Sequence, residues 1–116
     1  MAITLKSNSV GTSGFIANGY SADLSGCETL VAAVSGKTII VESITINSNT
    51  AINYTIGDGE TGGAVTAVLI GPIYCAANST QSFVFPRGLR LTAATALVVD
   101  ASGAGAATVI AQGRIE

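Results

Sequence analysis

The fold class of this chain is indicated by the stretch TIIVESITIN, residues 38–47. It is rich in β-branched residues, which favour an extended strand. Its apolar face runs through odd-numbered positions up to Val41 and through even-numbered positions from Ile44 onward. Because side chains alternate between the two faces of a strand, this switch predicts a β-bulge at Glu42-Ser43, where one extra residue re-aims the side chains beyond it. The alternative is a strand that is buried on both faces.

Short apolar or alternating runs, separated by turn residues, continue along the chain. The run 52–56 alternates with polar residues, which predicts a strand with one solvated face. The run 64–70 has no polar face, which predicts a strand covered on both faces. No window has the apolar spacing of an amphipathic helix. The remaining predicted strands are 29–34, 82–85, 89–91, 96–100 and 106–115, with 73–76 as an extension of 64–70 beyond Gly71-Pro72.

These runs predict an all-β fold, an antiparallel and jelly-roll-like β-sandwich of about eight to nine short strands with almost no helix. The length of 116 residues predicts a single domain, 1–116. Residues 1–26 are rich in Ser, Gly and Asn, with Phe15, Ile16 and Tyr20 as isolated apolar anchors. This composition predicts an N-terminal arm or loop region with at most one weak strand.

Charge is scarce throughout the sequence. Only 10% of the residues are charged, whereas a typical domain has about 25%. The mean hydropathy is +0.57. The longest charge-free stretch, 61–86, contains glycines, a proline and polar residues, so it does not predict a membrane-spanning helix. We therefore expect the apolar surface to be covered by another protein surface in a symmetric assembly, a homodimer or a homotrimer.

Several classes of partner and location are disfavoured by the same composition. Five Lys and Arg residues, scattered along a chain of net charge −2, form neither a stripe for nucleic acid nor a patch for anionic lipid. The first six residues lack the basic start and apolar core of a signal peptide. We expect no nucleic acid, no membrane partner and synthesis in a cytoplasm.

Catalysis is also disfavoured. The chain has no histidine, so the usual base for a serine or cysteine nucleophile is missing, and histidine-containing zinc sites are excluded. Cys27 and Cys75 are expected to be small buried residues, and whether they form a disulfide stays open. We therefore expect no enzyme, no catalytic residue, no cofactor and no metal.

One motif matches a cofactor site by its letters alone. Residues 57–62 read GDGETG, but a β-rich run comes next where a dinucleotide site needs a helix, so turn chemistry is the better explanation. Asp58, Glu60 and Asp100 are too few carboxylates to predict a calcium site, although a structural ion there is an alternative.

Three segments carry a resemblance to a known class of proteins. They are TLVAAVSGKTIIV at 29–41, GPIYCAAN at 71–78 and PRGLRLTAATAL at 86–97. Their pattern of turns and apolar runs resembles small virion proteins of tailed bacteriophages, of the head decoration or cement type. The resemblance covers about three quarters of the chain and leaves residues 1–27 outside.

The resemblance implies a structural protein on the outside of a capsid. Such proteins use a jelly roll or a related sandwich, and they sit as dimers or trimers over junctions of the major capsid protein, which would be the partner. The implied location is the capsid surface of the virion, after synthesis in the host cytoplasm. A tail, neck or fibre-associated module and a carbohydrate-binding β-sandwich are the alternatives.

The expected contact residues fall in two groups. The first contains apolar anchors in the N-terminal region, and the second contains arginines whose planar guanidinium groups suit carboxylates on a partner. They are Ala2, Ile3, Leu5, Phe15 and Tyr20 in the first group, and Arg87 and Arg90 in the second.

Overall fold

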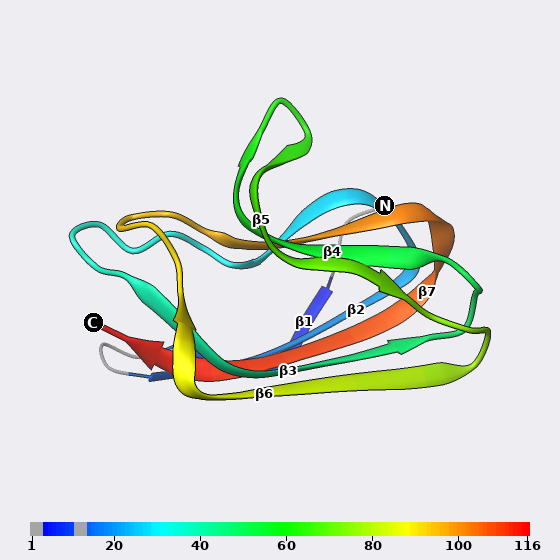
Figure 1. Ribbon diagram of the computed structural model, residues 1–116, viewed down its shortest axis with the longest axis horizontal. Helices are drawn as coiled ribbons and strands as arrows, with labels where there is room; N and C mark the ends of the chain where they lie inside the picture. Colours follow the sequence, from blue (N-terminus) through cyan, green and yellow to red (C-terminus); the bar gives the residue numbers. More distant parts are fainter. Residues whose placement is uncertain (1–3, 11–13) are drawn as a thin grey trace.

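The protein is a single antiparallel sheet of seven strands that curls around its core (Figure 1). The computed structural model describes the backbone of residues 4–10 and 14–116, and the side chains of 14–20 and 27–116. No helix occurs in these ranges, so the expected all-β class is confirmed. The strands are β1 (Thr4–Val10), β2 (Gly14–Val31), β3 (Ile39–Ser48), β4 (Asn53–Thr61), β5 (Ala64–Tyr74), β6 (Ser79–Arg90) and β7 (Leu97–Ile115).

The curl of the sheet follows from its longest strand, β7. The C-terminal part of β7 lies between β2 and β3, whereas its N-terminal part, Leu97–Ala101, lies between β2 and β4. The register between β2 and β7 shifts at 21–26, where both strands change course. The strand order is therefore β1-β2-β7-β3-β6, with β4 and β5 attached to the other part of β7.

The core is enclosed between the two parts of the curled sheet. Ile44 and Ile46 of β3 are fully buried, as are Tyr54 and Ile56 of β4. The hydroxyl groups of Tyr54 and Ser48 are 2.8 Å apart in a buried hydrogen bond that links β4 to β3. The other buried side chains in the described residues are apolar except for that of Asp58, and burial of apolar surface is the term that stabilises a small domain most.

The bulge predicted in the opening stretch is confirmed. The register of β3 shifts between Val41 and Ser43 against both neighbours, β6 and β7. Beside the bulge, Gly113 of β7 is opposite Val41. A Cβ atom on Gly113 would clash with the carbonyl oxygen of Ile40 and lie 2.8 Å from the ring of Phe15. The close approach of the strands at this point therefore needs glycine.

The structure differs from expectation in the number of strands and in the N-terminal region. Seven long strands replace the expected eight or nine short ones, because 82–85 and 89–90 belong to one strand, β6, and the strands predicted at 96–100 and 106–115 are joined in β7 through the predicted turn at 102–105. Residues 4–10 and 14–26, expected as an arm or loop, are strands. Small inward residues such as Ala17 and Gly19 hid their alternation, and pairing with β7 extends them.

The predicted double cover of 64–70 is also wrong. This segment of β5 pairs with β4, and its pairing within the described residues ends there. Val68 is 61% exposed.

Candidate interaction surface

The outward side chains of β2, β7, β3 and β6 form an ordered grid. In each of these strands they alternate with residues that face the core. The pairing registers arrange them as three rows that cross the four strands in the order β2, β7, β3, β6. The rows are Ile16, Gln112, Ser43, Val84; then Asn18, Ile110, Thr45, Ser82; then Tyr20, Thr108, Asn47, Thr80. We call these twelve residues the outer face.

The outer face carries no charged residue. Several of its polar side chains bond to each other across the strands. The hydroxyl groups of Thr45 and Ser82 are 3.1 Å apart, and the Asn47 amide donates to the Thr80 hydroxyl at 2.8 Å. These bonds fix the side chains before any partner arrives, which lowers the entropy that a partner's binding costs.

Large apolar side chains are exposed on the outer face. Among the described side chains, six large hydrophobic residues are exposed, and four of them are Ile16, Tyr20, Val84 and Ile110. Ile16 and Tyr20 are the diagonal neighbours of Ile110, within reach of long side chains on one face of a sheet. Apolar side chains grouped on the surface, among polar residues, are typical of an interaction site.

Charged residues gather at one end of this face. The Arg114 guanidinium donates to Glu42 at 2.8 Å and to Glu116 at 2.7 Å, and Arg90 donates to Glu116 at 3.0 Å. Hydrogen bonds from Arg114 and Arg90 hold the pKa of the Glu116 carboxyl below its ordinary value. Arg90, expected to bind a partner's carboxylate, is thus paired within the chain, whereas Arg87 is an exposed residue of β6.

The N-terminal contact residues have different outcomes. Ala2 and Ile3 lie outside the described residues, and Leu5 belongs to β1, where its backbone is opposite Gly19. Phe15 is 4% exposed and is part of the core, so it packs inward instead of facing a partner. Tyr20 is 38% exposed and belongs to the outer face.

Sequence reasoning missed most of the outer face. Ile110, Val84 and the hydroxyl rows were placed in strands, but their common side depends on pairing between segments far apart in the chain. The scarcity of charge in the sequence indicated that an uncharged interaction surface exists, but it did not show which residues form that surface.

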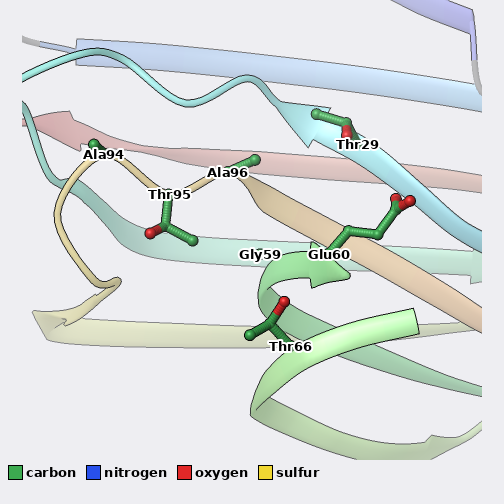
Figure 2. Close-up of a pocket in the computed structure, with 7 residues that line it drawn as sticks. All are labelled: Thr29, Gly59, Glu60, Thr66, Ala94, Thr95 and Ala96. Atoms are coloured by element: carbon green, nitrogen blue, oxygen red, sulfur yellow. The ribbon is translucent and has the colours of Figure 1, made fainter. Parts of the chain in front are cut away.

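A hollow of about 500 Å³ lies elsewhere, where the β4–β5 hairpin meets the loop before β7 (Figure 2). Its polar side chains are the carboxylate of Glu60 and the hydroxyls of three threonines; an aromatic ring, which would stack on a sugar, is not among its lining residues. The lining residues are Thr29, Gly59, Glu60, Thr66, Ala94, Thr95 and Ala96.

No helix comes after the glycine motif at 57–62, as expected, but the turn predicted for it is confined to its end, because residues 57–61 belong to β4. Gly62 and Gly63 form a two-residue hairpin loop in which both φ angles are positive, a conformation that glycine adopts without strain. Asp58, however, is not a turn residue. It is 7% exposed, and its Oδ2 atom accepts hydrogen bonds from the backbone and the hydroxyl of Thr92 at 3.0 and 2.7 Å. It therefore ties the hairpin to the loop before β7.

The two cysteines are free thiols. Burial, together with the charges of Glu60 and Asp100, raises the pKa of the Cys27 thiol from 9.0 to about 11. A thiol with this pKa stays protonated and is a poor nucleophile. In the described part of the chain, no three His, Cys, Asp or Glu residues are grouped so that they could hold a metal ion.

A comparison of the chain with protein families, curated proteins and solved structures found no match. Within the described residues, no helix is long and apolar enough to cross a membrane.

Proposed function

We propose that this chain is a structural virion protein that binds the outside of a phage capsid and stabilises the shell as a cement or decoration protein. The outer face is the observation that carries the proposal. It is uncharged, it carries four exposed large apolar side chains, and part of it is ordered by its own hydrogen bonds, so it suits a protein surface. The resemblance of 29–41, 71–78 and 86–97 to phage head proteins supplies the identity of the shell.

The mechanism needs no reaction centre. A protein that binds the assembled lattice, and not its free subunits, stabilises the lattice by mass action. Each copy can contribute a modest area, because the symmetry of a shell repeats one contact many times. We also propose that the curled sheet is a jelly-roll-like sandwich, which is supported by the way its two parts enclose a common core.

Ile110 offers the sharpest test, because it lies inside the grid and is 40% exposed. Ile110→Lys places a charge in the middle of the contact without entering the core. We expect at least a tenfold loss of affinity, which corresponds to about 1.4 kcal/mol. The assay is co-sedimentation with empty capsids of the phage that encodes the chain. Ala33→Lys, on an exposed residue of the loop 32–38, adds the same charge elsewhere and should bind like the wild type.

Three results would overturn the proposal. The first is equal binding of Ile110→Lys and the wild type. The second is labelled protein found on tails or necks instead of heads, which would support the tail, neck or fibre alternative. The third is saturable binding to a glycan array in place of capsids. The burial of Tyr54 removes one of the three tyrosines that could stack on a sugar, which counts against this alternative.

A further inference from the structure

The edge strand β5 is apolar on both faces and is nevertheless left exposed. Its segment 64–70 reads AVTAVLI, and a strand without a polar face is typical of one that is covered on both sides. In the structure, Val68 is 61% exposed and Tyr74 at the end of the strand is 73% exposed. The sequence of β5 is therefore typical of a strand whose side chains are more buried than they are in a single chain.

The three edge strands of the sheet differ in how they are protected. Natural proteins protect edges with charged residues, prolines or kinks, because unpaired N–H and C=O groups invite another strand. β1 contains Lys6, and β6 contains Pro86, Arg87 and a left-handed Gly88. The segment 64–70 of β5 contains none of these, and Gly71-Pro72 comes only after it. Residues 79–85 of β6 also lack charge, proline and a kink, but four of these seven residues are polar, whereas 64–70 of β5 contains one polar residue. Among the described edges, 64–70 of β5 is therefore the most apolar segment open to pairing.

We infer that β5 pairs with β5 of a second copy, antiparallel across a two-fold axis, to form a dimer. A two-fold axis brings one strand against itself, so the strand must carry no charge that would oppose its own copy. Residues 61–86 contain none. The polar side chain in 64–70 is that of Thr66, and its hydroxyl is already bonded to Thr61 at 2.7 Å. Covering this strand therefore buries no charge and leaves no hydroxyl unpaired.

The shape of the molecule allows this pairing. The tip of the β4–β5 hairpin projects from the rest of the curled sheet (Figure 1). Pairing of β5 with an unlike edge, β1 or β6, would be heterologous and would generate rings or open filaments. On the β1 edge it would also meet Lys6. A two-fold β5 dimer closes on itself and joins the two hairpins into one continuous ribbon.

The dimer goes beyond shell binding and does not depend on it, because it uses a different surface. The experiment is the solution mass of the full chain, without capsids, across a wide range of concentration. We expect the wild type at twice the mass of one chain and Val68→Lys at the mass of one chain. Val84→Lys is the matched control, since Val84 is also a valine on an edge strand, 72% exposed, and it should remain a dimer. Circular dichroism checks that each variant retains its β-sheet.

Hydrogen exchange gives a second readout that does not rely on a variant. In the wild type, the amides of 64–70 should exchange more slowly as concentration rises, while those of β1 should not change. The inference is overturned by a wild-type monomer at every concentration, by a trimer, or by filaments. It is also overturned if Val84→Lys dissociates the assembly and Val68→Lys does not.

Discussion

Gly113→Ala is the substitution for which the structure gives the clearest expectation. Gly113 lies in β7 between Phe15 of β2 and Val41 of β3, beside the bulge. A Cβ atom there would clash with the carbonyl oxygen of Ile40 and would lie 3.0 Å from the carbonyl carbon. Both atoms belong to the backbone of a central strand, so they cannot rotate away as a side chain would. The strands must separate locally to accept one methyl group.

The expected cost follows from two opposing effects. Forcing an extra methyl group into a tightly packed site costs about 1–3 kcal/mol, and contact with backbone places this site at the upper end. Replacing glycine restricts the unfolded chain and returns about 0.4–1 kcal/mol. We therefore expect Gly113→Ala to lower the free energy of unfolding by about 2 kcal/mol. For a domain of this size that corresponds to a fall in Tm of about 10 °C.

Urea denaturation followed by circular dichroism measures this cost. The control is Gly14→Ala, whose register partner Arg114 is the neighbour of Gly113. A Cβ atom on Gly14 would have its nearest contact at 3.6 Å, which is ordinary van der Waals distance. Alanine at position 14 restricts the unfolded chain in the same way, so the free energy of unfolding of Gly14→Ala should be unchanged or slightly higher than that of the wild type. Equal stability of the two variants would refute the reasoning.

Two further predictions concern titratable groups. The thiol of Cys27 should be alkylated at pH 8 about a hundredfold more slowly than a thiol of pKa 9, and Glu60→Gln should accelerate the reaction by lowering the pKa of the Cys27 thiol. Mass spectrometry measures the alkylation rate, and a wild-type rate equal to that of a small free thiol contradicts the prediction. The pKa of Glu116 is lowered by Arg114 and Arg90, so its stabilisation is complete above the ordinary pKa of 4.5 and is lost as pH falls through the folded-state pKa. The Tm of the wild type should therefore fall more steeply than that of Glu116→Gln below pH 4.5, and parallel curves would exclude this contribution.

The parts of the fold that the sequence predicted are those with a local signal. The switch of apolar parity within 38–47 is visible over ten residues, and it located the bulge between Val41 and Ser43. The glycine motif was predicted to lead into a strand and not a helix, because the residues after it are β-rich, although its first five residues belong to β4 and not to the predicted turn. The burial of Tyr54 followed from clean alternation with its polar neighbours.

The missed features depend on segments far apart in the chain. The first strands look like a loop because Ala17 and Gly19 occupy inward positions that a larger residue would mark as apolar. The 64–70 segment looks buried because all but one of its residues are apolar. Its position at the edge of the sheet depends on its pairing with β4 alone, which its composition does not show. Gly113 gave no local sign of its role, because the obstacle to a side chain is the backbone of another strand.

The scarcity of charge in this chain leaves two of its surfaces uncharged. The accessible surface of 5507 Å² is close to the roughly 5,800 Å² expected for a folded chain of this mass, so the missing charge does not reflect an oversized core. The outer face and the segment 64–70 of β5 contain none of the charged residues, and Arg90, Arg114, Glu42 and Glu116 pair with each other at one end of the outer face. Because these are separate surfaces, the two proposals can fail independently. Ile110→Lys should dimerise but bind capsids at least tenfold more weakly through its altered outer face. Val68→Lys should keep that face intact, and its apparent affinity should fall only because a monomer lacks the second contact of a dimer.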